Sequence, residues 1–382
     1  MGCSRTRNVF CKVTGYGLLT VILCGTLLAG LNPGEFSFDN DVEWIGNGPG
    51  IRFGTYAIAF TEPIISAEQS DSFASSGFTF EVVLELPRIP SRGFQFIAAF
   101  HSGEDRSQLV IGQWRNHIIV MNGDDYDHKR RKPRLSVEIE ESPRKWRLMT
   151  VTSSKDETAV YLDGRRIGSK ADLLLRIPGE RRKGRLLLGN SVYNKHSWAG
   201  AISRLALYST VLHEDDINRH HLELQHAGDD VSVKSENPHL LYRFDETGGS
   251  IVRDHSDQHA HLSIPSKTVR LARRVFVSPL VDFNFSRSFV RDFVVNIIGF
   301  MPLGFVLMLT LRNFSGNARQ SGIVYVVAIG FVVSFGIELL QSWMPSRSSA
   351  QLDLLLNTLG AYFGAVCFTL ISHGESPSPA SE

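Results

Sequence analysis

Four long apolar stretches interrupt an otherwise mixed sequence. Residues 13–34 contain no charged residue, and three further stretches follow near the C-terminus, at 293–311, 322–343 and 354–372. Each has about the 20 residues that a helix needs to cross a hydrocarbon core of roughly 30 Å. The last 103 residues hold only 11 of the 79 charged residues of the chain. We therefore predict four membrane-spanning helices, one before and three after a large polar region.

Basic residues beside these stretches predict the orientation. Arg5, Arg7 and Lys12 precede the first stretch, and the loop between the second and third carries Arg312 and Arg319. By the positive-inside rule the N-terminus and this loop are cytoplasmic, which puts the polar region on the other side of the membrane. The first stretch fits a signal anchor or a cleaved signal peptide. We favour the uncleaved anchor, because no AxA cleavage pattern is present.

The polar region shows the period-2 alternation of half-buried strands. Residues 78–86 and 135–140 alternate apolar and mostly polar side chains, and 158–162 lead into an Asp163-Gly164 turn that suits a hairpin. Further predicted strands lie at 51–60, 94–100, 109–112, 118–121, 146–152 and 186–189. Many strands joined by turns, with one short helix after Leu212, predict an all-β sandwich of two sheets.

Composition narrows the classes of function. A net charge of +1 with 21% charged residues gives no basic excess for nucleic acid. The four cysteines lie in or beside apolar stretches, so the sandwich has no disulfide and relies on its core. No Cys/His spacing indicates zinc, and no GxSxG motif indicates a hydrolase. Glu138 and Glu140 share a strand face that we interpret as solvated exterior rather than a glycosidase pair.

Polar residues recur near the predicted outer ends of the last three apolar stretches. The group comprises Arg291, Asp292, Asn296, Glu338, Gln341, Arg347, Asp353 and Asn357. Most are three or four positions from another member, so they share helix faces. A charge inside a membrane helix costs about 2.5–3.5 kcal/mol, which favours a functional polar site. The alternative is structural, with amides joining helices and Glu338 paired to Arg347 or Arg291.

A second candidate site lies in the polar region. Asn122, Asp124, Asp125 and Asp127 cluster oxygen atoms on a predicted loop, which makes them candidate calcium ligands. Acidic turns also arise for backbone reasons alone. Three basic runs, at 129–132, 144–147 and 181–185, suit anionic lipid head groups or acidic glycans, or are simply solvated loops.

The polar residues of the C-terminal stretches resemble the VanZ-like family of bacterial membrane proteins. The matching residues lie between Ser288 and Ala365 and are Arg291, Asp292, Asn296, Gly299, Phe300, Pro302, Leu303, Gly304, Ser334, Ile337, Glu338, Gln341, Arg347, Asp353, Asn357, Gly360 and Gly364. The resemblance implies a role in the cell envelope, and the member that gives the family its name is associated with resistance to glycopeptide antibiotics. It implies no agreed chemistry and no established cofactor. Gly360 and Gly364 themselves indicate helix packing.

The polar region resembles laminin G-like, concanavalin A-like jelly rolls over about residues 44–221. The similarity rests on Trp146, residues 160–164, residues 188–190, residues 198–202, Leu207-Tyr208, Leu212 and Asp216-Ile217. It implies a jelly-roll fold more firmly than a ligand. Residues 241–246 and 254–256 look like the opening of another such module but are too few for one, so we interpret them as closing strands.

These features predict an N-terminal anchor (1–34), an extracytoplasmic jelly roll with closing strands (35–268), an interfacial linker (269–288), a VanZ-like domain of three helices (289–372) and a disordered tail (373–382).

We expect a multi-pass protein of the bacterial plasma membrane that contacts lipid and recognises an envelope glycan or lipid-linked carbohydrate. Whether it is an enzyme stays open. In that alternative, Glu338 and Asp353 act as acid and base on a lipid-linked substrate while Arg347 holds its anion. A function in adhesion alone is the least favoured alternative, because it does not explain the charged residues in the predicted membrane helices.

Overall fold

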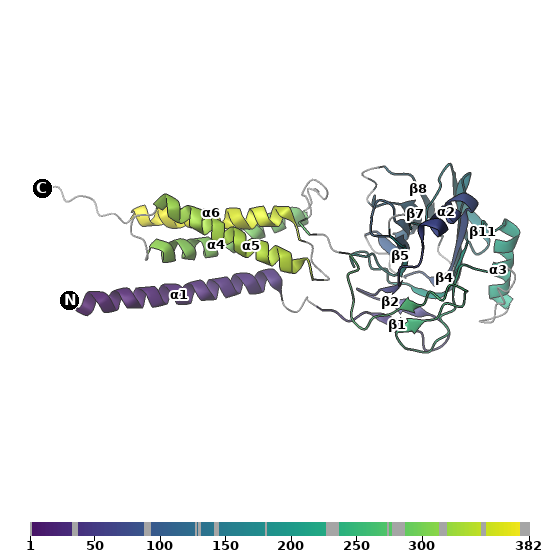
Figure 1. Ribbon diagram of the computed structural model, residues 1–382, viewed down its shortest axis with the longest axis horizontal. Coiled ribbons are helices and arrows are strands. Elements are labelled where there is room, and N and C mark those ends of the chain that lie inside the picture. Colours follow the sequence, from purple (N-terminus) through teal and green to yellow (C-terminus); the bar gives the residue numbers. More distant parts are fainter. Residues whose placement is uncertain are drawn as a thin grey trace. The chain divides into compact units, whose positions relative to one another are not determined.

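The computed structural model divides into two compact units (Figure 1). We refer to residues 1–37 with 273–382 as the membrane unit and to residues 38–272 as the sandwich. The structure describes residues 2–32, 37–87, 93–126, 128, 131–140, 145–179, 182–226, 237–272, 275–276, 287–312, 319–344 and 349–374.

Two antiparallel sheets form the sandwich. The strands of the first sheet are β1 (Val42–Trp44), β2 (Ile51–Phe53), β4 (Phe78–Glu85), β9 (Arg147–Ser153), β10 (Glu157–Leu162), β11 (Arg165–Ala171), β13 (Ala201–Tyr208) and β14 (Leu240–Tyr242). Their order is β1-β2-β13-β4-β9-β10-β11, with β14 also paired to β13. The strands of the second sheet are β3 (Ala59–Thr61), β5 (Gln95–His101), β6 (Leu109–Trp114), β7 (His117–Asn122), β8 (Arg134–Glu138), β12 (Arg185–Leu188), β15 (Ile251–Val252) and β16 (Leu262–Ser263). Their order is β15-β16-β3-β12-β5-β6-β7-β8, and the predicted all-β sandwich is confirmed.

Alternation along the strands decides which side chains enter the core. On β8, Leu135 and Val137 are buried in the core, whereas Ser136 and Glu138 are exposed, as a side-chain period of two requires. Side chains of the two sheets meet between them; the rings of Phe80 (β4) and Phe100 (β5) pack edge to face with centroids 6.3 Å apart. Burial of this apolar surface is the main source of stability of the sandwich.

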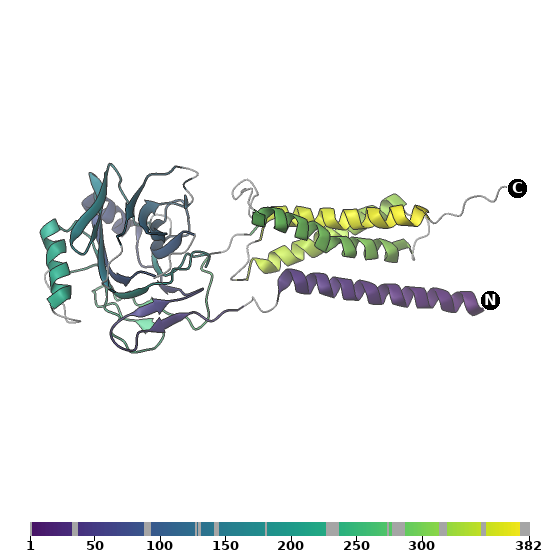
Figure 2. The same cartoon turned by 180° about the vertical axis from the view of Figure 1, so that it is seen from behind.

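One predicted strand is wrong. The sequence predicts a single strand over residues 51–60, but the structure has β2 and β3 there, in different sheets. Tyr56, between them, has a φ of 62°, a left-handed conformation that breaks an extended strand. Helix α2 (Ala67–Ser76) was not predicted, although Ser66 and Gln69 form a capping box at its start. The predicted helix after Leu212 is α3 (Glu214–His226), which lies against the first sheet (Figure 2).

The chain segments after α3 complete the sandwich, as the sequence predicts. Strand β14 pairs with β13 in the first sheet, and β16 pairs with β3 in the second. The two ends of the sandwich are also hydrogen-bonded to each other. The Asn40 N–H donates to the Ser266 carbonyl at 3.1 Å, and the Thr268 N–H donates to the Phe38 carbonyl at 3.0 Å. The first and last residues of the sandwich therefore lie next to each other.

The described residues of the membrane unit form four long helices: α1 (Gly2–Leu31), α4 (Arg287–Arg312), α5 (Arg319–Gln341) and α6 (Gln351–Gly374). By length and composition each could cross a membrane, through the segments Thr14–Leu31, Val290–Arg312, Gly322–Gln341 and Gln351–Ser372. These segments overlap the four predicted stretches. In both views of the molecule α4, α5 and α6 lie side by side, with α1 alongside them (Figures 1 and 2).

Small residues allow α4 and α6 to approach closely. A Cβ added at Gly364 of α6 would lie 2.0 Å from the carbonyl oxygen of Met301 on α4, and one added at Gly360 would lie 2.3 Å from that of Ile297. On α4, a Cβ at Gly304 would lie 2.0 Å from the carbonyl oxygen of Ala361. Membrane helices pack through such small-residue contacts because lipid gives no hydrophobic drive for association. Gly360 and Gly364 are packing positions, as predicted, and Gly304 is a further one.

Candidate functional site

Polar side chains from three helices meet at one end of the membrane unit. Asn296 on α4 donates from Nδ2 to Oδ1 of Asp353 on α6 at 2.7 Å. Asn357, one turn further along α6, donates from Nδ2 to Oγ of Ser334 on α5 at 3.0 Å. Each hydrogen bond joins two different helices. The structure therefore brings residues of three separate spans together near the start of α4, the end of α5 and the start of α6.

Glu338 on α5 is almost fully buried in this region, with 1% of its surface exposed. Its Oε2 accepts the backbone N–H of Ala350 at 2.9 Å, and the side chain of Ser349 also hydrogen-bonds to it. Ala350 directly precedes α6, whose first N–H groups lack partners within the helix and carry partial positive charge. The start of α6 therefore offsets part of the cost of burying this carboxylate in a membrane.

The second carboxylate of the region also lies at the start of α6. Asp353 is in the first turn of that helix and acts electrostatically on Glu338. Two like charges near one helix N-terminus repel each other, while the helix dipole attracts both. We call the resulting set the polar group; it consists of Asn296, Ser334, Glu338, Ser349, Asp353 and Asn357.

Three other predicted members, Arg291, Asp292 and Gln341, stand apart from the polar group. The side chains of Arg291 and Asp292 are 76% and 60% exposed and pair with each other at 3.5 Å. Gln341 donates from Nε2 to the carbonyl oxygen of Gly30, in the last turn of α1, at 2.8 Å. It therefore binds a neighbouring helix end rather than the polar group. Arg347 lies outside the described residues.

Two serines of the polar group were not predicted as site residues. Ser334 and Ser349 are both fully buried. The sequence signal for Ser334 is its position four residues before Glu338, which puts both on one face of α5. Ser349 lies just before α6, where a hydroxyl residue often caps a helix. A serine in a helix also commonly bonds its own backbone, so neither signal is specific.

Replacing Asn296 with alanine should lower the stability of the membrane unit by about 0.6–1.7 kcal/mol, which are the average and the maximum measured for hydrogen bonds between membrane helices. Thermal unfolding in detergent measures the loss. The matched control is Thr358→Ala, because the Thr358 hydroxyl bonds the Leu354 carbonyl of its own helix at 2.7 Å. Equal losses for the two variants would show that the Asn296–Asp353 bond does not join the helices.

The candidate calcium ligands are engaged with the protein itself. Asn122 donates from Nδ2 to the carbonyl of Arg176 at 2.8 Å. Asp124 pairs with Lys132 at 2.9 Å, and Asp125 is buried and pairs with Arg134 at 2.7 Å. Asp127 lies outside the described residues. Across the part of the chain that the structure describes, no group of three His, Cys, Asp or Glu side chains could hold a metal ion. Lys132 and Arg134 thus neutralise two of the four candidate calcium ligands, Asp124 and Asp125.

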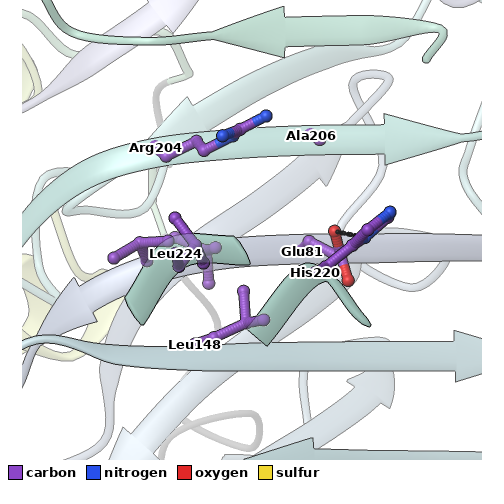
Figure 3. Close-up of a pocket in the computed structure, with 8 residues that line it drawn as sticks. Glu81, Leu148, Arg204, Ala206, His220 and Leu224 are labelled. Atoms are coloured by element: carbon purple, nitrogen blue, oxygen red, sulfur yellow. Dashed lines mark hydrogen bonds and ion pairs between the residues drawn. The ribbon is translucent and has the colours of Figure 1, made fainter. Parts of the chain in front are cut away.

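A small pocket lies between α3 and the first sheet (Figure 3). His220 of α3 and Glu81 of β4 form a buried pair, with His220 Nδ1 2.9 Å from Glu81 Oε2. Burial lowers the pKa of the neighbouring Arg204, and its Nη2 atom has no hydrogen-bond partner within the described part of the chain. The volume of about 10 Å³ is close to what one water molecule requires. We interpret the pocket as part of the attachment of α3, since a sugar would not fit.

Comparison with known families now defines the class of protein. Residues 62–218 match the concanavalin A-like lectin/glucanases superfamily, and residues 241–372 match the VanZ/LLP1 family. The chain is therefore a membrane protein in which a concanavalin A-like jelly roll precedes a VanZ-like segment, as the sequence resemblances indicated. The VanZ/LLP1 match spans residues 241–372, so it includes most of β14, all of β15, β16, α4 and α5, and nearly all of α6.

The solved structures that resemble this chain share little sequence with it. A Bacteroides ovatus protein for which carbohydrate binding has been proposed has 13% identity and a TM-score of 0.41, over 58% of this chain and 58% of its own. Trypanosoma rangeli sialidase has 15% identity and a TM-score of 0.37, over 51% of this chain and 30% of its own. Botulinum neurotoxin type C has 16% identity and a TM-score of 0.38, over 49% of this chain and 46% of its own. The chain thus spans less than two thirds of each, and these likenesses do not bear on its ligand. No curated protein matches the chain.

Proposed function

We propose that this chain is an envelope protein of the bacterial plasma membrane that recognises a glycan or a lipid-linked carbohydrate. In this proposal the sandwich lies outside the cytoplasm and contacts the sugar. The polar group of the membrane unit contacts the lipid end of the same molecule. Contribution to glycopeptide resistance is part of the proposal, and it rests on the VanZ-like segment alone. The expected result is that deleting the gene lowers the glycopeptide concentration that stops growth.

One observation supports this function most directly. The polar group lies at the end of the membrane unit where α1 ends and α4 begins, so both connections to the sandwich leave from that end. Two carboxylates and two amides there offer hydrogen-bond partners to hydroxyl or ammonium groups of a lipid head group. The match to a superfamily of lectins and glucanases supports a carbohydrate as the ligand of the sandwich. The contacts of Gln341 and Ile337 with Gly30 support α1 as a retained fourth helix.

Binding to the full chain in nanodiscs tests the proposal. The probes are free oligosaccharides, cell-wall fragments, and one disaccharide both free and carried on a diacylglycerol. We expect at least one probe to bind. We also expect Asp353→Ala to weaken binding of the lipid-carried disaccharide and to leave binding of the free disaccharide unchanged, because only the lipid end reaches the polar group. Thr358→Ala is the control. If no probe binds at millimolar concentration, carbohydrate recognition is wrong.

The alternative of a membrane enzyme is favoured by one observation, the proximity of Glu338 and Asp353. Two interacting carboxylates can differ in protonation, so that one donates and the other accepts a proton. Glu338→Gln separates the two functions, because the amide oxygen still accepts the Ala350 N–H while the proton-transferring carboxyl is lost. Release of free sugar or head group from the diacylglycerol-carried disaccharide, abolished by this substitution, would favour the enzyme.

A further inference from the structure

An exposed tryptophan lies on the outer face of the second sheet. Trp114 ends β6, and 38% of its surface is exposed. Its neighbour Gln113 points the other way, is 3% exposed, and accepts the Nε1–H of the buried Trp198 at 2.8 Å. Alternation therefore puts Trp114 on the face away from the core. Among the described residues of the sandwich, the other exposed large apolar side chains are Leu222 and Ile251, which are not aromatic.

Polar groups lie beside the indole in fixed positions. Trp114 is paired across the ladder with His117 of β7, which in turn is paired with Glu138 of β8. Their side chains therefore form one row on the outer face. Asn116, in the β6–β7 turn, donates from Nδ2 to Oε1 of Glu138 at 2.5 Å, and its Oδ1 lies 2.9 Å from Nδ1 of His117. These hydrogen bonds fix the donors and acceptors next to an apolar ring.

Arg115 completes the arrangement. It occupies the turn with a φ of 55°, a left-handed position where glycine or asparagine is usual. Its guanidinium lies over the Trp114 ring, 4.8 Å from the ring centroid. The cation holds the indole in place through a cation–π contact. The indole is thus oriented although much of it is in water, which distinguishes it from scattered exposed apolar residues.

Two further rings pack against the sheet on this face. Gly112 lies two residues before Trp114 and on the same face, and a Cβ added there would lie 2.4 Å from Cζ of Phe94. The Phe94 ring therefore lies directly over the strand. It stacks on Tyr126 with centroids 5.4 Å apart, and the Tyr126 hydroxyl accepts a hydrogen bond from Gln108 at 2.6 Å. Phe94 is itself buried, with 9% of its surface exposed, so these two rings support the sheet beside the indole and leave Trp114 as the exposed ring of this face.

We propose that Trp114, Asn116, His117 and Glu138 form a binding site for a neutral pyranoside within an oligosaccharide. The proposal rests on the carbohydrate recognition proposed above and names its location and ligand class. A pyranose has one face of C–H groups and an edge of hydroxyl groups. The indole takes the apolar face, and Asn116 and Glu138 hydrogen-bond the hydroxyl edge. The charges of Arg115 and Glu138 balance, so the site gives no preference to an acidic sugar.

The experiment measures affinities of the full chain in nanodiscs by calorimetry for cellotetraose, xylotetraose, mannotetraose and chitotetraose, with hyaluronan tetrasaccharide as an acidic probe. We expect one neutral probe to bind. We expect Trp114→Ala to weaken it at least about tenfold, Trp114→Phe to weaken it less, and Glu138→Gln to weaken it a few fold. Leu222→Ala, which removes an exposed apolar side chain from α3, should bind like the parent protein. Unchanged thermal unfolding of each variant shows that its fold is intact.

The outcomes separate the two proposals. If a neutral probe binds and Trp114→Ala binds it equally well, this site is wrong while carbohydrate recognition stands. If only the acidic probe binds, the neutral ligand class is wrong and the basic runs become the alternative site. If none of these probes, and none of the cell-wall fragments used above, binds to the parent protein, the proposed function itself fails.

Discussion

Replacing Gly364 with valine should prevent α4 and α6 from packing and leave little folded membrane unit. The added Cβ would lie 2.0 Å from the carbonyl oxygen of Met301 and 2.8 Å from the backbone nitrogen of Phe305. Both are backbone atoms of a helix, so neither yields without a shift of α4. Overpacking costs about 1–3 kcal/mol and occasionally more, and a clash with two backbone atoms puts this substitution at the upper end of that range. The polar group should be disrupted with it, because the Asn296–Asp353 bond joins the same two helices.

The matched control is Gly336→Val, because a Cβ at Gly336 meets no atom within 4 Å. Both substitutions put a β-branched residue in a membrane helix, so the difference between them isolates the contact with α4. The measurement is the fraction of each variant that stays monodisperse after heating in detergent. Equal behaviour of the two variants would mean that α4 and α6 do not approach as described.

Trp198→Ala should be the most damaging single truncation in the sandwich. Trp198 is fully buried, packs against Phe53 with ring centroids 6.0 Å apart, and donates its Nε1–H to Gln113. Truncating a buried tryptophan costs about 3–5 kcal/mol, and the amide oxygen of Gln113, which loses the Trp198 donor, adds to this. The free energy of unfolding of a domain is only about 5–15 kcal/mol, so this substitution removes a large part of the stability of the sandwich.

Protease resistance of the full chain at increasing urea concentration measures this effect, with cleavage sites mapped to the sandwich. The control for stability is Trp114→Ala, which removes the same side chain from a position that is 38% exposed. We expect the midpoint of Trp198→Ala to fall far below that of Trp114→Ala. Similar midpoints would contradict the placement of Trp198 in the core.

Local patterns predicted much of the fold because each needs only neighbouring residues. The four apolar stretches stand out by length alone, and the alternation over residues 135–140 is matched by β8. The strand over residues 51–60 failed for a tertiary reason. Both of its halves are apolar, but they enter different sheets, and no local feature except the turn at Tyr56 separates them.

The sequence predicted most of the residues of the candidate site but not the contacts that they make. Spacing along each helix indicated shared faces, and Asn296, Glu338, Asp353 and Asn357 do come together. The assignment of Gln341 depended on where α1 packs, which its sequence does not specify. Cations that neutralise Asp124 and Asp125 come from β8 and the residues before it, so their pairing follows from the hairpin rather than from the acidic run itself. Alternation alone shows that Trp114 faces outward, but not that 38% of its surface is exposed.

The hydrogen bonds that join residue 40 to 266 and residue 38 to 268 have a consequence for proteolytic shedding. If α1 and α4 both cross the bilayer and the sandwich lies outside the cytoplasm, as proposed, the sandwich is held by two connections whose sandwich ends lie next to each other. A protease that cuts either connection would leave the sandwich on the cell, because the other connection and the paired ends still hold it. Release into the medium requires two cuts. A singly cut protein would separate into two bands on a denaturing gel while remaining one particle under native conditions.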